Sequence, residues 1–350
     1  MKMKFFAAAA IAVLLSNFAG LAAVDNRRKV VKKRQVNRLV TLLPASDGVA
    51  VFEAKRFLDD ALPKILSANQ PLLGKIMSKI SEMENRTGID LRKFDQVAVG
   101  VAYKHVSAKD VDFEPIVIAN GDINAGALVA VARLASKGTY REEKIGERTV
   151  YVFTAKDIVQ KNTVTPNNAK VASMMDKALK GMSKEIAVTA IDRNTIAIGT
   201  LPKVRETLAG QTHVSVEITG LLAQRETAVM TFALRPPGGM AKLLPLDDDE
   251  LGTNLEAIQF ISGSLDVTAA GTSLQAMART KKPEQAAGLK DTLAGLQMIG
   301  RTFLGGSKRA DQQVYARMLK NARIDSRGTD VTLDLLVPQA DIDILIAGIK

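Results

Sequence analysis

The 350-residue sequence contains no cysteine and no tryptophan, and it has only two histidines and four tyrosines. The lack of cysteine excludes disulfides, thiol nucleophiles, thiolate metal sites and iron–sulfur clusters. Two histidines, His105 and His213, are too few for a multi-histidine metal site, and a Ser-His-Asp triad would have to use one of them. The scarcity of aromatics disfavours nucleic-acid or carbohydrate binding by stacking, and it predicts aliphatic cores.

Short catalytic motifs are missing as well. The chain has no G-x-S-x-G nucleophile elbow, no S-x-x-K, no phosphate-binding G-x-x-x-x-G-K-[ST] and no G-x-G-x-x-G that opens a helix. We therefore expect no catalytic residues and no cofactor. An enzyme that uses carboxylates alone would need no such motif and stays open as an alternative.

Positive charge is concentrated at the N-terminus. Residues 1–38 contain nine basic residues and one acidic residue, a net charge of +8. The remaining 312 residues carry 39 basic and 36 acidic groups, a net charge of +3. The overall pI of 9.7 is therefore poor evidence for a nucleic-acid-binding fold, and none is expected.

The first 22 residues have the three parts of a secretory signal. Lys2 and Lys4 precede an apolar run, and Gly20 and Ala22 place small residues at −3 and −1 of a cleavage site. We expect a signal peptide over 1–22 and an exported, periplasmic or secreted protein. The alternative is an uncleaved inner-membrane anchor, because residues 5–24 carry no charge and could span a bilayer.

A basic arm follows over 23–38, too charged to pack by itself. It either remains a solvated tail or binds an acidic surface, such as an envelope protein or anionic lipid headgroups. The possible contact residues are Arg27, Arg28, Lys29, Lys32, Lys33 and Arg34.

The body is predicted to be an α+β fold of two related units, 39–210 and 211–350, each an antiparallel sheet with helices on one face. The pattern is clearest over 185–210, which reads as strand, tight turn, strand and glycine-capped helix. A similar order of elements over 258–295 suggests that the two units are related by duplication.

Local sequence patterns also predict several further helices and a strand. We expect a helix over 57–66 broken or kinked at Pro63, a strand over 214–218 and a helix over 169–182. A long helix over 284–304 is expected to face inward with five apolar side chains: Leu289, Leu293, Leu296, Ile299 and Phe303.

Four runs in the middle of the chain carry a resemblance: 120–124 (NGDIN), 140–143 (YREE), 146–152 (GERTVYV) and 196–199 (IAIG). Together they resemble a class of uncharacterised exported bacterial proteins built from duplicated α+β units. The resemblance implies fold and location, and it supplies no catalytic residues.

The best candidates for metal ligands are four consecutive acids: Asp247, Asp248, Asp249 and Glu250. Carboxylates suit Ca²⁺, but an EF-hand loop needs alternating acids and a glycine at its sixth position. The simpler interpretation is a solvated loop that starts a helix, where acids favour the positive dipole end, so we expect no metal site.

These observations favour an exported envelope protein that acts as a non-enzymatic binding or interaction module, with a small apolar ligand possible. The alternatives are a carboxylate-dependent envelope hydrolase and a membrane-anchored scaffold. The ligand, the partner and the oligomeric state are not specified by the sequence.

Overall fold

The computed structural model describes residues 37–105, 111–136, 139–154, 185–222, 228–238 and 250–347. The fold is α+β, and the described strands form one open sheet in the order β11-β12-β10-β9-β8-β1-β2-β3-β7-β6-β5-β4. Every strand pair whose register is defined is antiparallel. The expectation of two separate sheets is therefore wrong, because local patterns predict strands but not which distant strand lies beside them.

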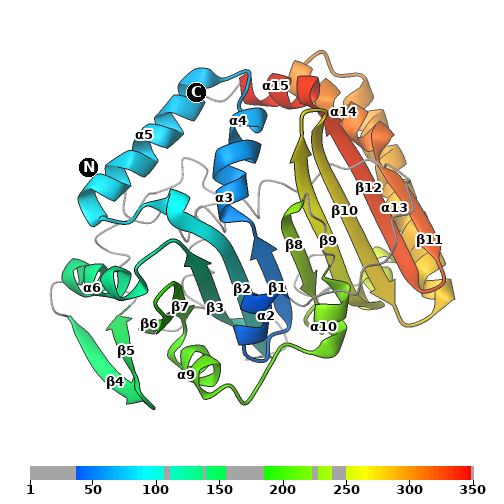
Figure 1. Cartoon of the computed structure of the whole chain (residues 1–350). Helices are drawn as coiled ribbons and strands as arrows, with labels where there is room; N and C mark the ends of the chain where they lie inside the picture. The colour runs from blue at the N-terminus through cyan, green and yellow to red at the C-terminus, as the bar shows by residue number, and fades with distance from the viewer. Residues whose placement is uncertain are drawn as a thin grey trace, which may run out of the picture. The chain divides into compact units, whose positions relative to one another are not determined.

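The chain divides into two compact units (Figure 1). Unit 1 contains 37–51 and 78–215, and unit 2 contains 52–77 and 216–347. Each unit thus includes segments from two separate parts of the sequence. Among the described residues the two units differ in the number of their strands, and a duplication is not shown. The single boundary predicted at 210/211 stays a prediction.

Unit 1 is built from hairpins. Its strands are β1 (Gly48–Phe52, whose last residue is grouped with unit 2), β2 (Phe94–His105), β3 (Val111–Gly121), β4 (Tyr140–Ile145), β5 (Arg148–Thr154), β6 (Glu185–Asp192) and β7 (Thr195–Gly199). Its helical segments are α2 (Arg38–Leu42), the second half of α5 (Gln70–Thr87), η2 (Leu91–Lys93), α6 (Ala125–Ala135) and α9 (Leu201–Ala209).

One local prediction for unit 1 is confirmed. The strand–turn–strand–helix over 185–210 forms as β6, β7 and α9, and Gly210 ends α9 with a φ of +61° that favours glycine. Asn124 caps α6 by accepting a hydrogen bond from the Ala127 amide.

The neighbours Ile196 and Ala197 point to opposite faces of the sheet and are both buried. Both faces are therefore covered here, whereas one covered face was expected.

Unit 2 contains β8 (Ala228–Leu234), β9 (Ile258–Thr268), β10 (Gly271–Thr280), β11 (Arg323–Arg327) and β12 (Asp330–Pro338). Its helices are α3 (Ala54–Arg56), the π-helical turn η1 (Phe57–Ala61), α4 (Leu62–Ile65), the first half of α5, α10 (Val216–Leu221), α12 (Glu250–Glu256), α13 (Pro283–Gly305), α14 (Ala310–Asn321) and α15 (Gln339–Ala347).

The helix expected to break or kink at Pro63 does not break there, but contains a π-helical turn just before the proline. The Leu62 amide bonds to the Phe57 carbonyl five residues back, just before the proline that has no amide hydrogen. The predicted helix over 169–182 lies outside the described residues.

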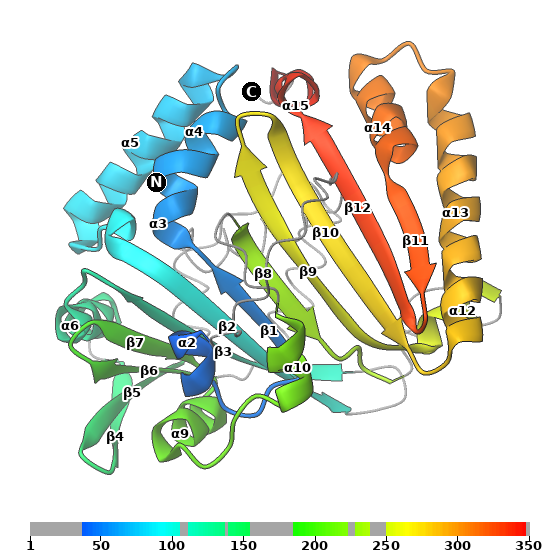
Figure 2. The same ribbon diagram turned by 45° about the vertical axis from the view of Figure 1, so that its right-hand side comes forward.

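The core of unit 2 lies on one face of its strands. Figure 2 shows α13 and α14 beside β12 and β11, and α13 also contacts β10. One buried cluster contains Leu289 of α13 and Val331 of β12. A second joins α4 and α15 to Val229, Val267 and Leu335.

Candidate functional site

A groove lies on the face of unit 2 that is turned away from the α13 core. Its volume is about 550 Å³. The floor comes from β9, β10 and β12, and α10 lies along the groove. Its lining residues are Val216, Glu217, Gly220, Leu221, Phe260, Ser262, Gly263, Ser264, Gln275, Ala276, Met277, Arg279, Thr332 and Asp334.

Strand alternation explains which side chains reach the groove. Successive side chains of a strand point to opposite faces, so Ala278 of β10 packs in the α13 core while Met277 and Arg279 line the groove. Antiparallel register brings the groove residues together. Gln275 pairs with Ser264 of β9, and Met277 pairs with both Ser262 of β9 and Thr332 of β12.

Four neutral polar side chains of the groove have no partner among the described residues. Ser262, Ser264, Gln275 and Thr332 make no side-chain hydrogen bond within the part of the chain that the structure describes. Ser262 and Ser264 are only 5% and 4% exposed. Their hydroxyl oxygens are not among the buried side-chain atoms that lack a partner, so these oxygens keep contact with solvent. The groove therefore offers hydrogen-bonding capacity that a bound molecule could use.

The cationic groups at the groove are already engaged. Arg279 donates two hydrogen bonds, of 2.7 and 2.9 Å, to the Asp330 carboxylate, and these bonds raise the pKa of Arg279. The Arg235 guanidinium lies 5.3 Å from the ring centre of Phe260. Since Asp330 offsets the charge of Arg279, the groove does not present a free cation at that position.

The helix α10 corrects a sequence prediction. A strand was expected over 214–218, because Val214, Val216 and Ile218 are β-branched or apolar at alternate positions. The segment instead forms a short helix from Val216 that buries Ile218 and leaves Val216 exposed beside the groove. Burial on one side of a helix outweighed the intrinsic strand preference.

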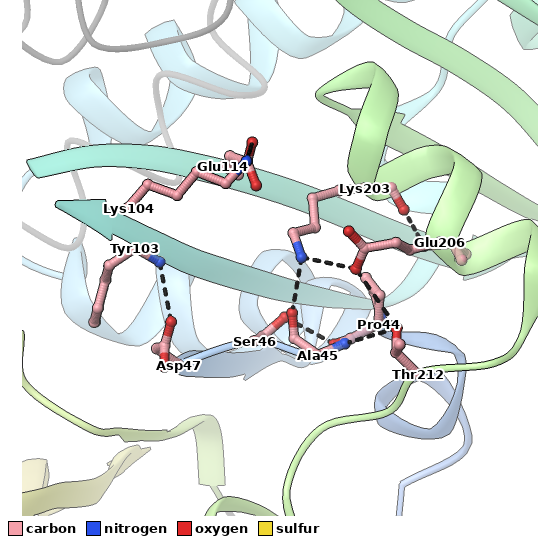
Figure 3. A network of polar contacts seen from close by, with 11 residues as sticks. Pro44, Ala45, Ser46, Asp47, Tyr103, Lys104, Glu114, Lys203, Glu206 and Thr212 are labelled. Carbon is pink, nitrogen blue, oxygen red and sulfur yellow. Dashed lines mark hydrogen bonds and ion pairs between the residues drawn. The ribbon is translucent and has the colours of Figure 1, made fainter. Parts of the chain in front are cut away.

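Unit 1 contains a separate polar network (Figure 3). The ammonium group of Lys203, on α9, donates to the Ala45 carbonyl at 3.1 Å and to the Glu206 carboxylate at 2.8 Å. The Thr212 hydroxyl donates to the same carboxylate at 3.5 Å and accepts from the Ala45 amide at 3.4 Å. The network therefore ties residues on both sides of Gly210 to the segment that leads into β1.

The second part of this network surrounds β2. The Asp47 carboxylate accepts a hydrogen bond from the Tyr103 amide at 3.0 Å, and burial raises the pKa of the Tyr103 phenol. Lys104 lies 2.5 Å from Glu114, whose hydrogen bond raises the pKa of Lys104. Each of these groups has a protein partner, so we interpret the network as a structural clamp rather than a binding site.

The residues singled out by the sequence do not form this site. His213 is exposed in the segment after α9, and His105 ends β2. Glu250 begins α12, whereas Asp247, Asp248 and Asp249 lie outside the described residues. Within the described ranges, no cluster of three or more histidine, aspartate or glutamate side chains could hold a metal ion. The basic-arm residues Arg27, Arg28, Lys29, Lys32, Lys33 and Arg34 also lie outside the described residues.

The groove was missed because its signal is divided among three strands. Each strand contributes two residues at alternate positions: Ser262 and Ser264 of β9, Gln275 and Met277 of β10, and Thr332 and Asp334 of β12. The alternation is visible in the sequence, but the register that places these pairs side by side is not.

No helix among the described residues is both long enough and apolar enough to cross a membrane. No protein-family model and no curated protein matches the chain. The structure is similar to two crystal forms of TP0453 from Treponema pallidum, each at 10% sequence identity. Form I has a TM-score of 0.41 and covers 89% of this chain and 97% of that one, and form III has a TM-score of 0.43 and covers 91% and 100%.

Proposed function

We propose that this chain is an exported, non-enzymatic binding protein and that the groove of unit 2 holds its ligand. The observation that carries the proposal is the set of four unpartnered polar side chains, Ser262, Ser264, Gln275 and Thr332, on one groove floor. Binding pockets combine an apolar lining with a few placed polar groups, and this groove has both.

The chemistry of the groove favours a small, neutral molecule that has both hydrogen-bonding and apolar parts. Hydroxyl and amide groups can donate and accept, so they match hydroxyl, carbonyl or amide groups of a ligand. Met277 and Phe260 supply apolar contact. The sequence allowed a purely apolar ligand, which would leave the four polar groups unsatisfied.

Export rests on the signal-peptide pattern of residues 1–22, and attachment to an acidic surface rests on the arm of 23–38. The two proposals are independent of the groove. An exported binding protein would carry its ligand in the envelope or outside the cell, and the basic arm would hold it near anionic headgroups or an acidic partner.

The mass of the native protein, purified gently from its own cells, tests both parts. We expect a chain that starts at Ala23 and carries extra mass that denaturation releases. A chain that keeps residues 1–22 and needs detergent would favour the membrane-anchored scaffold. A bare mature chain would remove the support for a bound ligand and give priority to a screen for hydrolase activity.

A matched pair of variants connects the extra mass to the groove. Met277→Trp fills space on the groove floor, whereas Leu134→Trp replaces an exposed side chain of unit 1. We expect Met277→Trp to lose most of the bound mass and Leu134→Trp to keep it. Equal occupancy in both variants would place the ligand elsewhere and overturn the assignment of the groove.

A further inference from the structure

The second half of α13 exposes apolar side chains that were expected to face inward. The exposed fraction is 81% for Phe303, 50% for Ile299 and 46% for Leu296. Met298, which was not expected to face inward, is 66% exposed. Leu296, Ile299 and Phe303 follow helical spacing and form one continuous stripe. Large apolar side chains gathered on a surface mark an interaction site more often than scattered ones do.

The rotation of α13 is set by its contacts with α14. The Gln297 side-chain amide donates to the carbonyls of Leu319 at 2.5 Å and Ala322 at 2.7 Å. A Cβ on Gly300 would lie 2.7 Å from the Leu319 side chain, so the two helices approach closely there. Turning the apolar stripe inward would break both contacts, and the stripe is therefore held outward.

Positive charge predominates along the chain between Asp291 and Asp311, where the stripe lies. Residues 292–310 contain three basic residues, Arg301, Lys308 and Arg309, and no acidic one. Arg309 pairs with Asp311 at 2.7 Å. Arg301 and Lys308 are exposed and form no ion pair within the described ranges of the chain.

We propose that this end of α13 docks on a lipid surface that carries anionic headgroups. Apolar side chains would enter the headgroup boundary, and Arg301 and Lys308 would lie among the phosphates. A second copy of the chain fits less well, because symmetric pairing of the stripe would bring the same cations together. Stable attachment needs two weak signals, and the basic arm and this stripe together would supply them.

The absence of tryptophan makes insertion directly measurable. Phe303→Trp places a single fluorophore at the tip of the stripe, and Leu134→Trp places one at an equally exposed position of unit 1, where Leu134 is 78% exposed. Each full-length mature variant is mixed with vesicles of phosphatidylcholine alone or with 30% phosphatidylglycerol. We expect a blue shift and protection from acrylamide quenching for Trp at position 303 with the anionic vesicles, and no change at position 134.

Sedimentation with the same anionic vesicles measures the contribution to affinity. Replacing both Ile299 and Phe303 by serine should weaken binding at least tenfold, because two apolar side chains no longer leave water. Leu134→Ser should change binding by less than twofold. The basic arm is present in both variants, so a difference in their vesicle affinity measures the contribution of α13. All the substituted side chains are exposed, so we expect both variants to fold.

Three results would overturn the proposal. The first is an aqueous emission spectrum at position 303 with every vesicle. The second is equal vesicle affinity of the serine variants. The third is protection at position 303 that rises with protein concentration in the absence of vesicles, which would identify a second copy as the occupant. None of these bears on the groove, whose test is the retained ligand.

Discussion

The Lys203 ammonium lies 2.8 Å from the carboxylate of Glu206, one helical turn away on α9, and the Lys203 side chain is only 6% exposed. Lys79 and Glu82 on α5 have the same spacing and the same 2.8 Å separation, but their side chains are 45% and 40% exposed. The two ion pairs share their residue types, spacing and distance, but Lys203 is far more buried than Lys79 and also donates to the Ala45 carbonyl. Loss of the Lys203 contacts should therefore cost more stability than loss of the Lys79 contact.

Lys203→Met should destabilise the protein by about 1–3 kcal/mol, because the Ala45 carbonyl and the Glu206 carboxylate lose a donor at a buried position. Lys79→Met should change stability by less than about 0.5 kcal/mol, as expected for a solvated pair. Urea unfolding followed by circular dichroism compares the two. Equal losses would show that the Lys203 contacts are not the structural clamp described above.

Glu143 on β4 should contribute stability that depends on pH. Arg205 of α9 holds its carboxylate with hydrogen bonds of 2.6 and 2.7 Å, and these bonds, with help from Arg141, lower the pKa of Glu143. A carboxyl whose folded-state pKa is lowered stabilises the fold above its unfolded-state pKa. That stability is lost as the pH falls through the folded-state pKa.

We therefore expect Glu143→Gln to be about 0.5–1 kcal/mol less stable than the native protein at pH 7, with the difference shrinking toward zero as the medium is acidified below the ordinary glutamate range. Glu147→Gln, at the exposed turn before β5, is the control and should show little difference at any pH. A Glu143 difference that grows on acidification would contradict the assigned ion pair.

Gly271 should tolerate no side chain. It opens β10 with a φ of +139°, and a Cβ there would lie 1.9 Å from the Val337 carbonyl oxygen of β12. Gly271→Ala should cost about 3 kcal/mol or more through backbone strain and overpacking. Gly295→Ala, inside α13 with no atom near the added Cβ, should instead stabilise by about 0.5–1 kcal/mol. Thermal unfolding of the two variants should give shifts of opposite sign.

The hydroxyl groups of the groove should be dispensable for folding. Thr332→Val removes a hydroxyl that has no described partner and should change the free energy of unfolding by less than about 0.5 kcal/mol. Thr280, also in unit 2, is 1% exposed, and its hydroxyl donates to the Lys282 carbonyl at 2.9 Å, a bond that Thr280→Val removes. This substitution should cost about 1–3 kcal/mol.

Stability is measured on ligand-stripped protein, and retained ligand is measured by native mass. We expect Thr332→Val to lower ligand retention while Thr280→Val leaves it unchanged in the folded fraction. A large folding cost for Thr332→Val would mean that its hydroxyl serves the fold rather than a ligand.

Local chemistry determined what the sequence could predict. The β6–β7 hairpin follows from its apolar strands and from the polar turn between Asp192 and Thr195, and Gly210 predicted the end of α9. All of these depend on residues within a few positions of one another.

Long-range pairing was beyond the sequence. β3 pairs with β7, and β10 pairs with β12, across long intervening segments. The single strand order, the discontinuous units and the groove all follow from such pairings. Hydrophobic pattern fixes the face of a strand but leaves its neighbour undetermined, because many registers bury the same apolar side chains.

In the helix α13, some properties were determined by the sequence and others by the tertiary structure. Its position, length and apolar content were determined by the sequence, because helical periodicity is a local property. Tertiary structure decided its rotation, because the Gln297 bonds to α14 and the close approach at Gly300 selected which apolar residues are buried. Leu289 therefore packs against the sheet, whereas Phe303, on the same helix, faces outward.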